Sequence, residues 1–175
     1  MTDLADELAL AQELAARADA LTLPAFEQRR FTLDWKANHT EVTEIDRGVE
    51  AMIAATLDEA RPDHGRLGEE YGVAGRVDSP WRWIVDPIDG TSGFVRGIPV
   101  WATLIALAHA DHGVVVGVVS APALGRRWWA SAGGGGRRRD AARSPTAGPA
   151  SCPTSRRSRT PRSASRSATA GSDSV

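Results

Sequence analysis

The chain has 175 residues, 42% of them hydrophobic and 25% charged, with a formal net charge of −1, as is ordinary for one globular domain with a sizeable core. The single cysteine, Cys152, excludes an intramolecular disulfide and a cysteine-based zinc site, which fits a reducing compartment. The acidic N-terminus excludes a signal peptide and no run approaches the ~18 apolar residues of a membrane span, so a cytoplasmic protein is expected.

Two helices are expected in the first third of the chain. In residues 3–21 apolar side chains recur at helical spacing with acids opposite, and Pro24 lies just past the expected end. A second helix should begin at Thr43, because Thr43 as N-cap and Asp46 three residues later form a capping box, and it should end at residues 61–62. Its buried face is predicted to consist of Ile45, Val49, Met52, Ile53 and Leu57.

Strands dominate the next part of the chain. Between the two helices, "FTLDWKANHTEV" predicts a short strand and a polar turn. Trp81–Val85 predicts a strand that stops where Pro87 removes a hydrogen-bond donor. "VWATLIALAH" and "GVVVGVVSA" predict a hairpin joined by residues 110–113, and "RRWWASA" predicts a third strand of that series. Helices followed by an antiparallel run indicate an α+β fold with helices packed on a sheet.

The last 39 residues differ from the rest. Residues 137–175 hold nine Arg, nine Ser and four Pro but only two acids, a charge of +7, whereas residues 1–136 carry 12 basic and 20 acidic groups, a charge of −8. Because the segment lacks large apolar side chains, it is predicted to be a disordered tail. Two interpretations stay open: a basic arm for nucleic acid, or out-of-frame translation of a GC-rich gene that begins in the glycine run 133–136.

Several acids flank strand and turn signals. Asp86 and Asp89 end the strand in "WIVDPIDGT", Glu69 and Glu70 lie in the preceding "GEE" loop, and Asp46 lies in "TEID". Converging carboxylates raise one another's pKa or recruit a cation, and hard oxygen ligands without His or Cys select Mg²⁺. The structural alternatives are a solvated loop pair for Glu69 and Glu70 and a purely capping role for Asp46.

A phosphate site is predicted next to these acids. Gly90 and Thr91 follow Asp89 at an expected helix start, where backbone N–H groups suit a phosphate. Metal, phosphate cradle and hydroxyl together indicate metal-assisted phosphate hydrolysis. The alternative is that Asp89-Gly90 simply forms a turn.

"VTEID", "GEE" and "WIVDPIDGTSGF", in this order, resemble the inositol monophosphatase family of Mg²⁺-dependent phosphatases. "WIVDPIDGTSGFVRGIPVWATLIAL" and "GVVVGVVSAPALGRRWWA" look like its histidinol-phosphatase branch. The resemblance covers about residues 3–132. It implies a layered α/β sandwich of the sugar-phosphatase type, a phosphomonoester substrate and a homodimer, with neither nucleic acid nor membrane as partner.

The resemblance also implies roles for individual residues. Glu69, Asp86 and Asp89 would bind Mg²⁺, and Ile88 would contribute its carbonyl oxygen. Thr91 would position the attacking water with Asp46 as its acceptor, so that the two share the general-base role. The phosphate would be held by Gly90, Thr91 and Ser92.

The chain also departs from the family. Ser92-Gly93 replaces a longer polar residue followed by Asn, and the family's C-terminal half, with a further metal-ligating Asp, has no counterpart after Gly136. We therefore expect a truncated chain with little activity of its own. The leading function is histidinol-phosphate hydrolysis in histidine biosynthesis; inositol, other sugar or nucleotide phosphates are the alternative substrates. A nucleic-acid-binding protein and a non-catalytic relic are the alternatives of another class.

Overall fold

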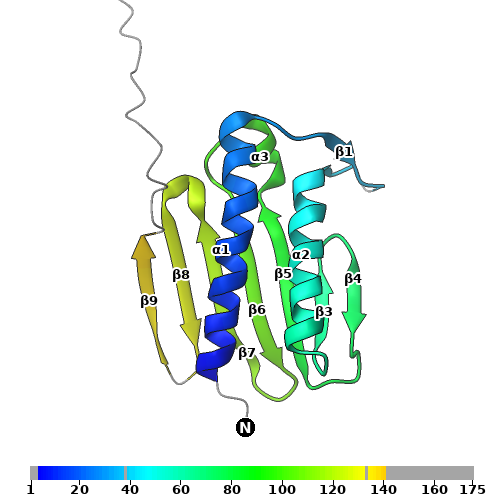
Figure 1. The fold of residues 1–175 in the computed structure, drawn as a ribbon, viewed down its shortest axis with the longest axis vertical. Helices are drawn as coiled ribbons and strands as arrows, with labels where there is room; N and C mark the ends of the chain where they lie inside the picture. Colours follow the sequence, from blue (N-terminus) through cyan, green and yellow to red (C-terminus); the bar gives the residue numbers. More distant parts are fainter. Residues whose placement is uncertain (1–3, 38, 133, 141–175) are drawn as a thin grey trace, which may run out of the picture. The chain divides into compact units, whose positions relative to one another are not determined.

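The computed structural model describes residues 4–37, 39–132 and 134–140. Two long helices lie on one face of a seven-stranded sheet, and a two-stranded ribbon and a short helix lie toward the top of Figure 1. The helical segments are α1 (Leu4–Gln28), α2 (Glu44–Ala60), α3 (Thr91–Arg96) and the 3-10 turn η1 (Pro122–Leu124). The strands are β1 (Leu33–Trp35), β2 (Glu41–Thr43), β3 (Gly65–Gly68), β4 (Gly72–Gly75), β5 (Trp81–Asp89), β6 (Ala102–His109), β7 (Gly113–Ala121), β8 (Arg126–Ser131) and β9 (Gly134–Asp140).

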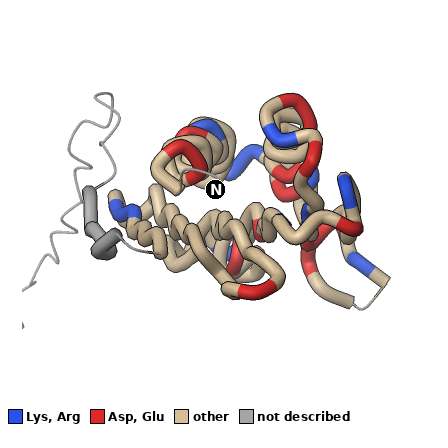
Figure 2. Tube along the Cα trace, turned by 90° about the horizontal axis from the view of Figure 1, so that it is seen from below, with Lys and Arg blue, Asp and Glu red and all other residues tan. Residues whose placement is uncertain are grey.

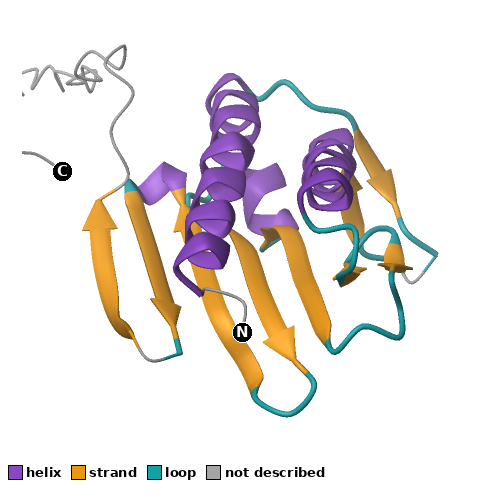
Figure 3. Cartoon of the chain, turned by 60° about the horizontal axis from the view of Figure 1, so that its bottom comes forward, coloured by secondary structure: helices purple, strands orange, loops and turns teal. Residues whose placement is uncertain are grey.

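The large sheet has the order β4-β3-β5-β6-β7-β8-β9. β3 pairs in parallel with β5, and the other strand pairs of the described residues are antiparallel. The predicted antiparallel run is confirmed for β5 to β8, but the parallel β3–β5 pair makes the whole sheet mixed, where an antiparallel sheet was expected. Figures 2 and 3 show α1 and α2 together on one side of it, which confirms the predicted α+β layers.

The first helix is longer than predicted. α1 runs to Gln28 and contains Pro24, although a proline inside a helix removes one backbone hydrogen bond and costs about 3 kcal/mol. Packing offsets this cost, because Ala25 is buried and Phe26 packs against Phe94 with 5.6 Å between ring centroids. Tertiary contacts on the last turn thus override the local stop signal.

The second helix begins where the sequence predicts. Thr43 is the N-cap of α2, and its hydroxyl oxygen accepts from the Ile45 and Asp46 backbone N–H groups at 3.2 and 3.4 Å. Asp46 Oδ2 accepts in return from the Thr43 backbone N–H at 2.8 Å and from its hydroxyl at 2.6 Å. The capping box is confirmed, and Arg61 is the C-cap.

Replacing Thr43 with Ala should lower the free energy of unfolding by about 0.5–2 kcal/mol, since the fully buried hydroxyl satisfies orphan N–H groups of the helix. Urea denaturation followed by circular dichroism measures the change. Thr43→Ser keeps the hydroxyl and is the control. An alanine variant as stable as the serine variant would contradict this account of the cap.

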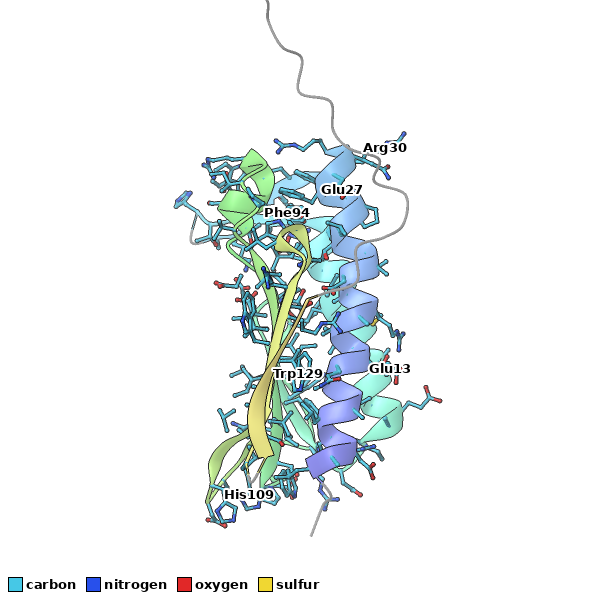
Figure 4. All side chains as sticks on the ribbon, turned by 90° about the vertical axis from the view of Figure 1, so that its left-hand side faces the viewer. Glu13, Glu27, Arg30, Phe94, His109 and Trp129 are labelled. Atoms are coloured by element: carbon cyan, nitrogen blue, oxygen red, sulfur yellow. The ribbon has the colours of Figure 1, made fainter. Side chains whose placement is uncertain are left out.

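Two apolar clusters lie between the layers. The larger one joins α1 and α2 to the sheet, and Trp83 and Leu107 at its centre are fully buried. The smaller one contains Ala25, Ile88, Phe94 and Trp101. Figure 4 views the layers edge-on, with Glu13 pointing outward from α1 and with Phe94 and His109 at opposite ends of the sheet. The smaller cluster therefore marks one end of the sheet, where β5 meets α3.

The predicted Arg-rich tail is described only at its beginning. β9 includes residues 137–140, which pair with β8. The predictions of disorder, nucleic-acid binding and frame change concern residues 137–175, and of these residues 141–175 lie outside the described part of the chain. Within the described part, the helices are either too short or too polar to cross a membrane.

Candidate active site

A cavity of about 670 Å³ lies at the end of β5 and the start of α3. Its lining includes all of the residues predicted to bind metal or phosphate: Glu69, Asp86, Ile88, Asp89, Gly90, Thr91 and Ser92. Asp46, the predicted base, reaches the same place through a hydrogen bond from Thr91. The structure thus brings together residues from three separate sequence motifs.

A β-bulge in β5 brings the two aspartates to the same side of the strand. Successive side chains of a strand alternate between faces, so residues 86 and 89 would normally point to opposite faces. Asp86 pairs with Leu104 and Asp89 with Ala102, so the stretch between the aspartates holds one residue more than its partner strand. That extra residue restores a common face. Contrary to the prediction, the strand continues through Pro87 to Asp89.

Buried contacts hold the bulge in place. The Ile88 side chain is 1% exposed in the smaller apolar cluster. The Pro87 carbonyl accepts from the Thr103 hydroxyl at 2.8 Å. Because both ends of the bulge are anchored in this way, the Ile88 carbonyl is left at the cavity side, where the Thr91 hydroxyl lies 3.0 Å away.

Glu69 comes from the turn that directly follows the neighbouring strand β3. β3 runs parallel to β5 with Gly68 opposite Val85, and the Glu69 backbone N–H donates to the Val85 carbonyl at 3.2 Å. This register puts Glu69 beside Asp86. Burial, followed by the hydrogen bond and charge of Glu69 and by the charge of Asp89, raises the pKa of Asp86 from 3.8 to about 8.

The donor chemistry of this cluster fits a hard divalent cation. Asp86 Oδ1 is buried and has no hydrogen-bond partner among the described residues. Carboxylates of Glu69, Asp86 and Asp89 with the Ile88 carbonyl form an oxygen-only set, which suits Mg²⁺. However, no three Asp, Glu, His or Cys side chains in the described ranges converge on one point as a preformed ion site.

Lys36 supplies the counter-charge of these acids. Its ammonium lies 2.8 Å from Glu69 Oε1 and 2.6 Å from Glu70 Oε1. Burial by itself lowers the pKa of Lys36, but the bonds to both glutamates outweigh it and raise that pKa. Burial raises the pKa of Glu70. In the sequence, Lys36 stands out only as the single lysine beside 20 arginines.

Thr91 and Asp46 form a hydroxyl–carboxylate pair beside the acids. The Thr91 hydroxyl lies 3.1 Å from Asp46 Oδ1, and its single proton can go either to this atom or to the Ile88 carbonyl. Burial raises the pKa of Asp46, opposed by hydrogen bonds from Thr43 and Thr91. Asp46 therefore both caps α2 and accepts from Thr91, so the capping role does not exclude the predicted one.

The start of α3 has the geometry of the predicted phosphate loop. Gly90 is the N-cap with φ of 90°, a conformation that favours glycine, and a Cβ there would also lie in tight contact, 3.1 Å from the Val100 carbonyl oxygen. The Ser92 hydroxyl donates to Glu41 Oε2, which also accepts from Arg96 at 2.9 Å. In this structure the Ser92 side chain is thus bonded to Glu41.

The β1–β2 ribbon supplies a wall that the sequence did not predict. Five residues from this region line the cavity: Trp35, Lys36, His39, Thr40 and Glu41. Arg96 of α3 also lines it. Trp35 is 59% exposed. These residues line the cavity only because the ribbon folds over the end of β5. Local sequence patterns do not predict that arrangement.

Comparison with known proteins gives a consistent picture. The model of the inositol monophosphatase family matches residues 3–173. A histidinol-phosphatase of Streptomyces coelicolor is 52% identical over 131 residues, covering 73% of this chain and 48% of the relative. One of Mycobacterium tuberculosis is 53% identical over 123 residues, covering 70% and 46%. The chain thus spans about half the length of the curated relatives it matches.

Solved structures share the fold. The extragenic suppressor protein suhB of Bartonella henselae has a TM-score of 0.70 at 31% identity, covering 77% of this chain and 52% of that one. An IMPase of Thermotoga maritima has a TM-score of 0.69 at 31% identity, covering 76% and 51%. With a family model that matches most of its length, the chain belongs to the inositol monophosphatase family.

Proposed function

We propose that the cavity is the active site of a Mg²⁺-dependent phosphomonoesterase whose substrate is histidinol phosphate. The observation that carries the proposal is the meeting of two groups in one cavity: the oxygen donors around Asp86 and the Thr91–Asp46 pair. The substrate assignment is supported by the identity of 52% and 53% to two histidinol-phosphatases over 131 and 123 residues. Inositol-1-monophosphatase of Mesorhizobium japonicum is 47% identical over only 83 residues.

The proposed division of labour follows from the geometry. Glu69, Asp86, Asp89 and the Ile88 carbonyl would hold Mg²⁺, which supplies Lewis acidity toward a phosphate ester and its attacking water. Thr91 donates its proton to Asp46 and turns its lone pairs toward the cavity, where they accept from a water and orient it. The N–H groups of the Gly90–Ser92 turn bind phosphate oxygens.

Phosphate release from histidinol phosphate should require Mg²⁺ and stop in excess EDTA, because the carboxylates alone repel a phosphate dianion. Release is measured colorimetrically at high protein concentration, with inositol-1-phosphate and a sugar phosphate in parallel. Asp89→Asn should lose the activity. Asp111→Asn, which changes an 81% exposed acid, controls for contaminating phosphatases.

The outcomes separate the parts of the proposal. EDTA-resistant release, or equal release by Asp89→Asn, would contradict the proposed site. Faster turnover of inositol-1-phosphate would contradict the substrate assignment alone. The 175 residues on their own are predicted to turn over substrate weakly. Mg²⁺ binding is therefore measured by calorimetry beside each rate, so that the site is tested even where the rate is low.

A further inference from the structure

Glu50 is a buried carboxylate that none of the proposed catalytic roles uses. Its side chain belongs to α2 and the residue is 4% exposed. Glu50 follows Asp46 by four positions, so the two acids lie on the same face of the helix, one turn apart. α2 lies over the part of the sheet that contains β3 and β5 (Figure 1).

Both oxygens of Glu50 bind the turn that carries Glu69 and Glu70. Oε2 accepts from the Glu70 backbone N–H at 2.7 Å, and Oε1 accepts from the Tyr71 backbone N–H at 2.9 Å. Hydrogen bonds to an ionised acceptor are about twice as strong as neutral ones. The other side of the turn is held by the bond from the Glu69 N–H to the Val85 carbonyl.

Gly68 leaves the space in which this carboxylate lies. A Cβ on Gly68 would be 1.7 Å from Glu50 Oε1, far inside contact distance. The backbone of Gly68 lies outside the left-handed region, so the requirement for glycine comes from close approach and not from conformation. The first residue of "GEE" is thus explained by a partner 18 positions earlier in the chain.

We propose that Glu50 is a positioning residue for the metal site: it fixes the turn 69–71 so that Glu69 faces Asp86. α2 then braces both halves of the site from one face, since Asp46 bonds Thr91 and Glu50 bonds the Glu69–Glu70 turn. The brace consists of the two hydrogen bonds that Glu50 accepts from the Glu70 and Tyr71 backbone N–H groups. This inference rests on the proposed function, because it gives the brace a role in binding Mg²⁺. A residue that merely stabilised the turn would not change metal affinity in the folded protein.

Two substitutions disturb the brace from opposite sides. Glu50→Gln keeps one acceptor but turns an amide N–H₂ toward the other backbone N–H. Gly68→Ala keeps the charge and displaces the carboxylate. A cavity of about 420 Å³, lined by Glu50, Gly68 and Tyr71 among others, gives the displaced side chain room, so this variant can fold. Matched controls on α2 are Glu59→Gln, at an exposed position, and Gly48→Ala, where a Cβ meets nothing within 4 Å.

The test combines amide hydrogen exchange at Glu70 and Tyr71 with Mg²⁺ calorimetry on the full chain, at a temperature where circular dichroism shows each variant folded. Both brace variants should exchange these two amides at least about 10-fold faster. Both should also bind Mg²⁺ about 10–100-fold more weakly, as for other residues that orient metal ligands. The two controls should match the unsubstituted chain in both readouts.

Three results would overturn the proposal, and they are distinguishable. Unchanged exchange at Glu70 and Tyr71 in Glu50→Gln and Gly68→Ala would show that the brace does not exist. Faster exchange with unchanged Mg²⁺ affinity would leave Glu50 a structural role only. Failure of the unsubstituted chain to bind Mg²⁺ would overturn the proposed function itself, and the positioning role with it.

Discussion

Replacing Asp86 with Asn is expected to abolish the stabilisation of the protein by Mg²⁺ and to lower phosphatase activity by more than about 10²-fold, the upper range for outer-shell substitutions at metal sites. Asp86 Oδ1 is buried without a hydrogen-bond partner in the part of the chain that the structure describes, so under the proposed function it would be a ligand of Mg²⁺. Thermal unfolding with and without Mg²⁺ measures the first effect and phosphate release the second.

The same variant should change how stability depends on pH. The pKa of Asp86 is 3.8 when unperturbed and about 8 in the fold, so the folded protein holds this proton more tightly than the unfolded chain. Below about pH 3.8 both states are protonated. As pH rises toward about 8 the unfolded chain loses the proton first and the free energy of unfolding falls, an effect that is complete above the folded pKa.

In EDTA, the Tm of the unsubstituted chain should therefore fall more steeply between pH 5 and 9 than that of Asp86→Asn, and the variant should be the more stable of the two at about pH 9. Affinity for Mg²⁺ should rise over the same range, because binding displaces the proton. Asp111→Asn serves as the charge control. Parallel curves for Asp86→Asn and the unsubstituted chain would contradict the assignment of the shifted proton to Asp86.

Thr91→Val is expected to lower kcat about 10²–10⁴-fold, the range for loss of a group that takes part in proton transfer. Valine has nearly the shape of threonine but can neither orient a water nor donate to Asp46, so Mg²⁺ affinity should change little. Phosphate release and Mg²⁺ calorimetry separate the two. Thr91→Ser restores the hydroxyl and should recover most of the rate; full activity in the valine variant would exclude the proposed role of the Thr91–Asp46 pair.

What the sequence predicts well is local. The capping box of Thr43 and Asp46 needs residues three apart, and the hairpin of β6 and β7 needs two apolar runs around one turn. Both are confirmed because neighbours in the chain decide them. The same local rule is wrong at Pro24 and Pro87, where packing of distant residues carries a helix and a strand past a proline.

What the sequence does not predict depends on contacts between distant segments. β3 and β4 are short and glycine-rich, with Gly65, Gly68, Gly72 and Gly75 at their ends, so they carry no strand signal of their own. Lys36 meets Glu69 across 33 positions, and Glu50 meets Glu70 across 20. The acids of the site are predictable from their motifs, whereas the groups that position and neutralise them require the fold.

The bulge in β5 makes the number of residues between Asp86 and Asp89 matter as much as their identity. Deleting a single residue there would remove the bulge and leave the aspartates two positions apart, on one face of a regular strand but without the extra residue whose carbonyl lies at the cavity. Removing both intervening residues would make the aspartates neighbours, so that one would stay in the cavity and the other would turn to the face that packs against the helices. In this protein the number of residues between the two aspartates of "DPID", together with the bulge, thus decides whether both carboxylates point to the same face of the strand.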